Sequence, residues 1–218
     1  MVKISYRWLT VIVTSVLIGC YPNGATYIQE LDLVATNYDN TFDFKAHKTY
    51  AIPDSVILIT GDLLDSSTRT KPDFISNTYA LPILNTIKQN MSNYGWTLVD
   101  KNSNPDVLIL PSAISTTYLY YYYDWWYWGW YYPYYPYYGW GWYYPYYPPY
   151  SVSSYTVGSV FVQMVEVASL HPGAGSQAHV VWTGIFNGLL EGATTDVIAR
   201  AQTSINAAFA QSPYLNIK

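Results

Sequence analysis

The amino-acid sequence predicts an α+β fold: a single domain with a mixed β-sheet covered by two helices and interrupted by an insert rich in Tyr, Trp and Pro. Three observations support this prediction. Short β-branched and apolar runs recur along the chain, as in strands, and two longer stretches place apolar residues at helical spacing. Strand-like runs resume after the aromatic segment, so this segment divides a domain and does not end it. We expect the domain to span residues 31–218 and the insert to span 118–155.

Several strand-length runs are bounded by turn residues. The strongest is Val107-Leu108-Ile109-Leu110, whose continuous apolar character is typical of a central strand buried on both faces. Pro53 ends an earlier run, because proline has no amide hydrogen to give to a sheet. The β-branched run 56–60 either extends that earlier strand or forms one of its own. The strands are expected at 31–38, 41–44 with 48–52, 56–60, 96–99, 106–118, 155–167 and 179–189.

Two helices are predicted from apolar periodicity. The first lies within 73–94, and Gly95 stands where a C-terminal cap belongs. Pro82 either kinks this helix or marks the first turn of its second half, so the well-formed part is expected from Pro82 to Asn93. The second is capped by Thr194 or Thr195 and ends before Pro213. Its apolar stripe consists of Val197, Ile198, Ala201, Ile205, Ala208 and Phe209.

The N-terminus has the order of a bacterial lipoprotein signal. Lys3 and Arg7 precede an apolar run that is too short to span a bilayer comfortably. The run ends in Leu17-Ile18-Gly19-Cys20, which looks like a lipobox, in which the Cys thiol is acylated and becomes the first residue of the mature chain. Two or three acyl chains attach a protein permanently to a membrane. We expect a signal peptide over 1–19, lipidation at Cys20 and a tether over 20–30.

The residues around Cys20 also predict a location. Cys20 is the only cysteine, so the exported fold must be stable without an internal disulfide. Tyr21 follows it at the position where Asp would favour retention in the inner membrane. We therefore expect anchoring in the outer membrane, with the domain facing the periplasm and surface exposure left open.

The charge of the chain argues against a nucleic-acid partner. The formal net charge is −4, and loss of the leader with Lys3 and Arg7 makes it more negative. The remaining Lys and Arg residues form no cluster, whereas nucleic-acid binding needs a basic face.

The aromatic insert is the most unusual part of the sequence. Between Tyr120 and Tyr150 it consists almost entirely of Tyr, Trp, Pro and Gly, without the Leu, Ile and Val of an ordinary core. Its aromatic rings suit three partners: a glycan, on which they stack; the membrane interface; and a protein surface. A fourth interpretation is a passive loop produced by repeat expansion. The candidate contact residues are Trp125, Trp126, Trp128, Trp130, Trp140 and Trp142.

No catalytic, metal or cofactor site is predicted. His47, His171 and His179 lack the helical spacing or carboxylate neighbours that are typical of metal sites. Asp106 is better placed to end a turn than to act as an acid or base. Trp182 is expected in the core, alternating with Val180 on one strand face. We expect a non-enzymatic protein; the alternative is an envelope hydrolase or transferase, which needs converging polar groups in a pocket.

Short motifs in a fixed order carry a resemblance to a known family. They are Phe42-Asp43-Phe44, Thr49-Tyr50, Tyr94-Gly95, Pro105-Asp106-Val107-Leu108-Ile109, Gly158-Ser159-Val160, Val181-Trp182-Thr183-Gly184 and Phe209 to Pro213. With a Tyr- and Gly-rich insert among them, they resemble the bacterial lipoproteins of domain-of-unknown-function family 4136. The resemblance implies the fold and an envelope location, and it supplies no activity.

Overall fold

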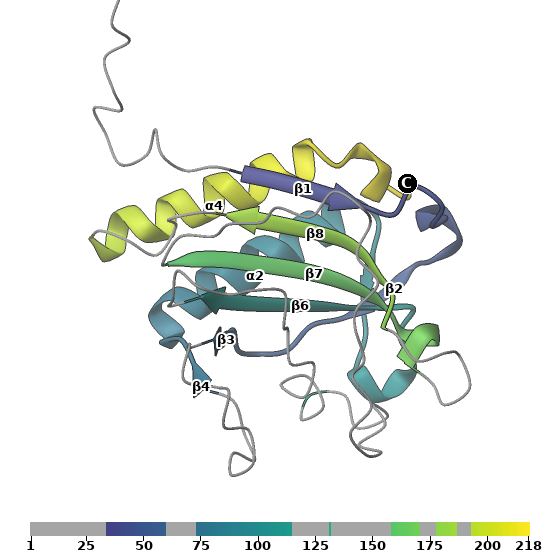
Figure 1. Cartoon of the computed structure of the whole chain (residues 1–218), viewed down its shortest axis with the longest axis horizontal. Coiled ribbons are helices and arrows are strands. Elements are labelled where there is room, and N and C mark those ends of the chain that lie inside the picture. Colours follow the sequence, from purple (N-terminus) through teal and green to yellow (C-terminus); the bar gives the residue numbers. More distant parts are fainter. Residues whose placement is uncertain (1–33, 60–72, 115–130, 132–157, 171–177, 187–192) are drawn as a thin grey trace, which may run out of the picture. The chain divides into compact units, whose positions relative to one another are not determined.

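The computed structural model describes residues 34–59, 73–114, 131, 158–170, 178–186 and 193–218. All of them lie in one compact unit, Leu31–Lys218. They form a mixed β-sheet with two helices (Figure 1), which confirms the predicted α+β class. The strands are β1 (Val34–Tyr38), β2 (Thr49–Ala51), β3 (Ile57–Ile59), β4 (Asp73–Phe74), β5 (Thr97–Leu98), β6 (Val107–Ile114), β7 (Ser159–Glu166) and β8 (Val180–Phe186). The helices are α2 (Asn77–Asn93) and α4 (Thr194–Ala210), and short 3-10 turns are η2 (Phe44–Ala46), η5 (Lys101–Ser103), η6 (Val167–Leu170) and η7 (Pro213–Leu215).

The strands follow the order β1-β8-β7-β6-β2-β5 across the sheet. The pairs β1–β8, β8–β7 and β7–β6 are antiparallel, whereas β2 runs parallel to both β6 and β5. β3 also pairs with β6, in parallel, and β4 pairs with β3. Because β7 occupies the other edge of β6, β2 and β3 behave as one strand interrupted around Pro53. The run 56–60 therefore contributes a strand of its own, β3, which continues the line of β2 along the same edge of β6.

The central position of β6 confirms the sequence prediction. All of its residues are buried. Val107, Ile109 and Ala113 point into the core on the side of the helices. Leu108, Leu110 and Ile114 belong to a second apolar cluster on the other face.

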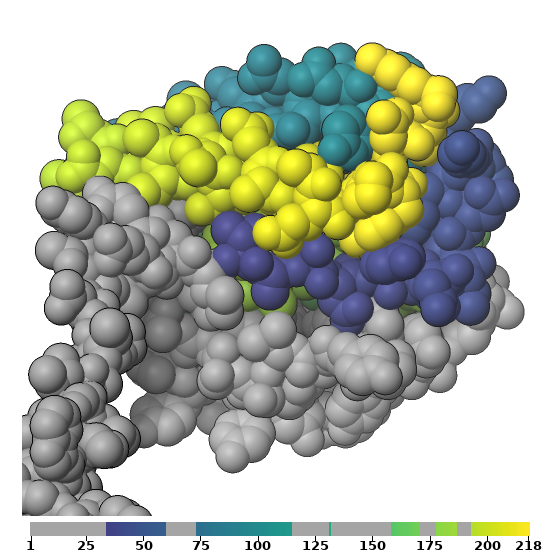
Figure 2. All heavy atoms as spheres, turned by 90° about the horizontal axis from the view of Figure 1, so that it is seen from above, coloured from purple at the N-terminus to yellow at the C-terminus, as the bar shows by residue number. Residues whose placement is uncertain are grey.

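The two helices lie side by side on one face of the sheet (Figure 2). Leu84 and Ile87 of α2 and Ile205 and Phe209 of α4 are buried against the sheet. The C-terminal segment closes this layer, because Trp96 donates its indole N–H to the carbonyl of Leu215 at 2.8 Å. The core therefore forms between the helix layer and the sheet.

Both helices begin at places that the sequence did not predict. α2 starts at Asn77, before Pro82, because the side chain of Ser76 accepts the N–H of Thr78 and caps the helix. Asp73 and Phe74, expected within this helix, form β4 instead. α4 has Ala193 at its N-cap without a side-chain bond; the hydroxyl of Thr194 bonds to that of Tyr79 at 3.1 Å.

The predicted C-terminal cap of the first helix is confirmed. Gly95 has φ +97°, a conformation that favours glycine. Its N–H bonds to the carbonyl of Ser92 at 3.1 Å, and the N–H of Trp96 bonds to that of Met91 at 3.0 Å. These two bonds satisfy carbonyls that the helix end leaves open.

The predicted strand over 41–44 is wrong. Residues Phe44–Ala46 form the turn η2, capped by the carboxylate of Asp43, which accepts the N–H of Lys45 at 3.1 Å. The carboxylate of Asp39 likewise accepts the N–H of Thr41 at 2.8 Å. Local side-chain bonds of this kind compete with the strand ladder.

Trp182 is buried, as predicted, but Val180 does not share its face. Trp182 lies in the core beneath the helices, whereas Val180 belongs to the second cluster. The register shifts between β7 and β8, since Met164 pairs with Trp182 and Val165 with Val180. This β-bulge accounts for the change of face.

A prediction follows for Gly184, whose backbone is covered by the Trp182 ring. A Cβ added there would lie 2.8 Å from Cη2 of Trp182. Gly184→Ala should therefore reduce the free energy of unfolding by about 1–3 kcal/mol, because extra volume strains a packed core. Urea unfolding of Gly184→Ala in wild-type and Trp182→Phe backgrounds checks this. The cost should be smaller beside Phe, and an equal cost in both backgrounds would contradict the clash.

Candidate functional site

The anchor and contact residues predicted from sequence lie outside the part of the chain that the structure describes. They are Cys20, Trp125, Trp126, Trp128, Trp130, Trp140 and Trp142. None of the described helices is long and apolar enough to cross a membrane.

The aromatic insert connects two strands that pair along their whole length. β6 leads into it and β7 leads out, with Ile114 opposite Ser159. Gly158, at φ +80°, donates its N–H to the carbonyl of Ile114 at 2.8 Å. The sheet thus holds together the described residues on either side of the insert, Ile114 and Gly158.

Tyr131 is the described residue of the insert, and it packs on the folded domain. Its side chain is 7% exposed and belongs to the apolar cluster on the face opposite the helices. Lys101 of η5 donates its Nζ to the carbonyl of Tyr131 at 2.7 Å and lies 5.0 Å from the centre of its ring. Burial, with the carboxylates of Asp100 and Asp54, raises the pKa of the Tyr131 hydroxyl above its ordinary value. The sequence predicted no such contact, because Lys101 has no pattern that distinguishes it from other surface lysines.

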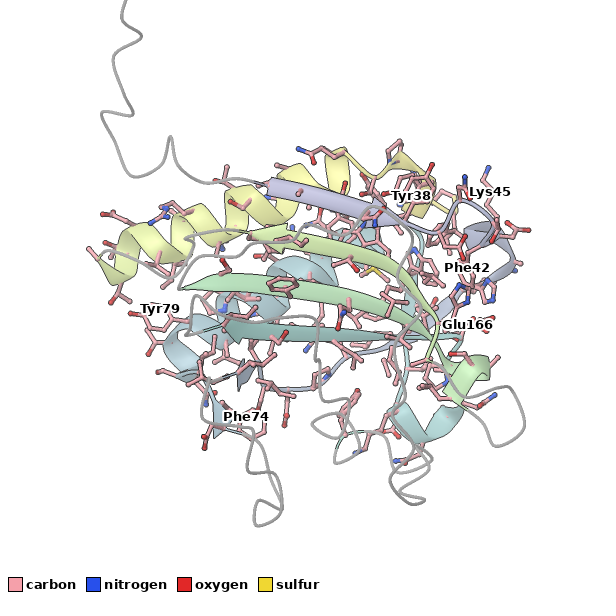
Figure 3. The ribbon with its side chains drawn as sticks, viewed as in Figure 1. Tyr38, Phe42, Lys45, Phe74, Tyr79 and Glu166 are labelled. Carbon is pink, nitrogen blue, oxygen red and sulfur yellow. The ribbon has the colours of Figure 1, made fainter. Side chains whose placement is uncertain are left out.

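A second arrangement of polar groups lies at one end of the sheet, where His179 binds two carboxylates. Its Nε2 is 2.7 Å from Oδ2 of Asp39, and its Nδ1 is 2.9 Å from Oε2 of Glu166. Figure 3 shows Glu166 at this end with Phe42. We call this arrangement the histidine bridge.

The geometry of the histidine bridge favours a charged ring. A neutral imidazole has one N–H and one lone pair, so it can donate to only one of the two carboxylates. Burial by itself lowers the pKa of His179, but the hydrogen bonds and charges of Glu166 and Asp39 outweigh it and raise the pKa. Burial likewise acts to raise the pKa of Asp39, but bonds from Thr41 and His179 bring it below its ordinary value. The bridge therefore favours an imidazolium between two carboxylates over a neutral ring.

The prediction that the histidines lack carboxylate neighbours is wrong for His179. A signal for half of the bridge was present, because Glu166 lies at the end of the predicted strand 155–167 and His179 at the start of the next predicted strand, 179–189. Asp39 is 140 positions away from His179, and only the β1–β8 pairing brings it close. Sequence spacing contains no trace of that contact.

The histidine bridge does not have the form of a metal site. Its carboxylates bind to different nitrogens of one ring, so the three side chains do not converge on a common point. Over the described residues, no group of three or more His, Cys, Asp or Glu could hold a metal ion. The arrangement can instead fix the position of a charge and change with its protonation.

Comparison with known proteins identifies the family. The sequence model of a domain of unknown function, DUF4136, matches residues 34–214. The chain belongs to the DUF4136 family. A crystal structure of a DUF4136 family protein from Bacteroides thetaiotaomicron is similar, with 32% identity and a TM-score of 0.62 over 86% of this chain and 98% of that one.

A weaker likeness is to a PelC dodecamer from Paraburkholderia phytofirmans, with 10% identity and a TM-score of 0.39 over 85% of this chain and 99% of that one. This score is too low to support an argument. No curated protein matches the chain.

Several motifs of this DUF4136 domain have structural roles. Gly95 caps α2, Gly158 joins the ends of the insert, and Asp106 connects β2 to β6. Oδ2 of Asp106 accepts the backbone N–H groups of Lys48 and Thr49 and the hydroxyl of Thr49, each at 2.8 Å. The N–H of Asp106 returns a bond to Oγ1 of Thr49 at 2.9 Å. Asp106 is thus a structural link between strands, and the prediction that it ends a turn is too narrow.

We predict that Asp106→Asn weakens the domain and alters its acid sensitivity. Burial raises the pKa of Asp106, but the bonds from Lys48 and Thr49, with nearby His47, bring it below its ordinary 3.8. Its contribution is therefore present above pH 3.8 and is lost as the pH falls through the folded pKa. The substitution should cost about 1–3 kcal/mol near neutral pH and less at pH 3, measured by urea unfolding at both.

Thr49→Val provides a matched control for this prediction. It removes the two bonds that involve the Thr49 hydroxyl and keeps the carboxylate with its backbone bonds. Its cost should be smaller than that of Asp106→Asn and should retain the wild-type acid sensitivity. An Asp106→Asn cost that is the same at pH 3 and pH 7 would contradict a charged link.

Proposed function

We propose that this chain is a lipid-anchored, non-enzymatic protein of the bacterial cell envelope whose domain displays an aromatic segment for contact with an envelope component. The anchor is Cys20, the membrane is the outer membrane, and the domain faces the periplasm. The component is a glycan, a membrane surface or a protein partner. The proposal assigns contact to Trp125, Trp126, Trp128, Trp130, Trp140 and Trp142.

The observation that carries the proposal is the closure of the insert at its base. Ile114 and Ser159 are paired, and Gly158 bonds to Ile114. Strands β6 and β7 can therefore form their ladder whatever residues the insert contains. A segment that the sheet does not need for pairing is free to be selected for binding, and Tyr and Trp are the side chains that contribute most at binding surfaces.

The contact of Tyr131 with the domain adds support. Lys101 bonds to the main chain of Tyr131 and lies over its ring. A segment fixed at one point loses less conformational entropy when it binds, which raises affinity.

The alternative, an envelope hydrolase or transferase, needs a general base or nucleophile in a pocket. The histidine bridge is the arrangement that comes nearest to one. Both nitrogens of its ring already bond to carboxylates, so the ring has no lone pair to accept a proton from a substrate. This chemistry favours the contact protein over the enzyme.

For the anchor, we predict that Cys20→Ala moves the protein from the membrane fraction to the soluble fraction. The thiol is the only one in the chain, and without it no acyl chain can be attached. Fractionation of cells that express each form, with metabolic labelling by a fatty acid, measures the change. Wild-type protein that takes up no label, or a Cys20→Ala form that stays with the membrane, would refute lipidation.

For the contact surface, we predict that replacing the six tryptophans by Ser weakens binding to isolated envelope material at least ten-fold. Each aromatic contact is worth roughly 1 kcal/mol. The comparison uses the soluble Cys20→Ala chain with and without the six changes, and both keep Tyr131 and its bond to Lys101. Sedimentation with purified glycan, lipid vesicles or envelope proteins distinguishes the three classes of partner. Equal binding by both chains would show that the tryptophans are passive.

A further inference from the structure

The histidine bridge joins three segments of the chain at one end of the sheet. Asp39 follows β1, Glu166 closes β7, and His179 directly precedes β8. Among the described strands, β1 pairs only with β8 and so forms an edge of the sheet. The bridge therefore links the end of this edge strand, through one ring, to the next two strands.

The main chain around the histidine bridge depends on the same residues. Asp39 donates its N–H to the carbonyl of Val181 at 3.0 Å, and Glu166 donates its own to that of His179 at 3.0 Å. The second oxygen of Asp39 holds Thr41 through both its N–H and its hydroxyl. On the hairpin side, the hydroxyl of Ser169 accepts the N–H of His179 at 2.9 Å and donates to the carbonyl of Glu166 at 2.6 Å. The position of the loop after β1 therefore depends on the position of the Asp39 carboxylate.

We propose that the histidine bridge is a pH-sensitive latch, which fixes the end of β1 to the sheet while the His179 ring is protonated and releases it when the ring loses a proton. The reason is the number of donors on the ring. A neutral ring can donate to one carboxylate only, and its remaining lone pair then faces a carboxylate oxygen less than 3 Å away. The neutral ring can keep only one of the two bonds. We assign the loss to Asp39, which follows the edge strand β1, because Glu166 lies in β7, which is paired on both sides.

The surroundings of His179 make it the group that responds. Its side chain is 25% exposed, and the centroids of the His179 and Phe42 rings lie 6.0 Å apart with an interplanar angle of 82°. On the side of η2, the charged or titratable neighbours are Asp43, Lys45 and His47. His47 stacks on Phe42 at 4.4 Å, but its Nδ1 bonds to the backbone oxygen of Asp43.

On the side of β6, the neighbouring groups are Asp106 and Lys48, which bond to each other through the carboxylate and the backbone N–H. The carbonyl of Asp106 accepts the N–H of Val167, next to Glu166. In the described structure, the carboxylates of Asp39 and Glu166 bond directly to the ring of His179. The ring of His47 bonds to a backbone oxygen instead, so His47 is a suitable control.

The direction of each pKa gives the pH range of the closed latch. The folded pKa of His179 is raised above 6.5, so its contribution is complete below pH 6.5 and is lost as the pH rises through the folded value. The folded pKa of Asp39 is lowered below 3.8, so its contribution is present above pH 3.8 and is lost as the pH falls through the folded value. The latch is closed between these two folded pKa values, and it opens as the pH rises above that of His179.

The test is amide hydrogen exchange of the purified full-length protein between pH 5.5 and pH 9.5, with each rate divided by the intrinsic rate at that pH. Protection of the β1 amides and of residues 39–42 should fall by about ten-fold as His179 deprotonates, the size expected for a hydrogen bond to a charged group. Protection of β6 should stay constant. Constant β1 protection over the whole range would overturn the latch.

Three variants make the test specific. Asp39→Asn and His179→Gln should show low β1 protection at all pH values, whereas His47→Gln should behave as wild type. NMR titration of the ring should place the midpoint of His179 above 6.5 in wild type and lower in Asp39→Asn. A pH response that survives His179→Gln, or disappears with His47→Gln, would reject the assignment to His179. The wild-type series needs no variant, so the proposal stays testable if His179→Gln does not fold.

Discussion

The burial of β6 on both faces is the constraint on which the rest of the structure depends. A strand that is apolar on two sides needs a layer on each side, and its backbone must be paired along both edges. α2 and α4 supply one layer. β7 fills one edge over the full length of β6, while β2 and β3 share the other. A polar link also supports this strand, since the carboxylate of Asp106, directly before β6, accepts the N–H of Thr49 in β2.

The sequence predicted the parts of this fold that depend on local chemistry. A few neighbouring residues were enough to predict the buried strand at Val107–Leu110, the glycine cap at Gly95 and the apolar stripe of α4. The sequence failed where short-range side-chain bonds, or the pairing of one strand with another, override the apolar pattern. Asp43 and Asp39 bend the segment 41–44 into turns, Ser76 starts α2 before Pro82, and a bulge beside Val180 reverses its face. The histidine bridge was missed for a different reason, because Asp39 and His179 are 140 positions apart and meet only once β1 lies beside β8.

The register of β6 and β7 places the two candidate functions far apart. The described ladder ends on the side of the insert where Ile114 faces Ser159, and the histidine bridge lies where Val107 faces Glu166, at the other end of the same ladder. Loss of a bond in the bridge would therefore affect the end of β1 and the nearby ends of β7 and β8 more than the residues beside the insert. β1 is also the first described strand of the chain. Its N-terminal end, Val34, pairs with Phe186 at the insert end of the sheet, so the latch holds the opposite end of β1.

The bond between Gly158 and Ile114 has an evolutionary consequence. Once the ends of a connection are held by their own ladder, the entropy cost of a longer connection grows only with the logarithm of its length, about 0.6 kcal/mol for each doubling. Tyr-Tyr-Pro units can therefore be gained or lost by slippage during replication with little effect on folding. Relatives of this chain can be expected to differ widely in the length and composition of this segment, while the strands on either side of it keep their length. Pairing at the base of the hairpin thus allows the sequence of the insert to vary while the sequence of the flanking strands is conserved.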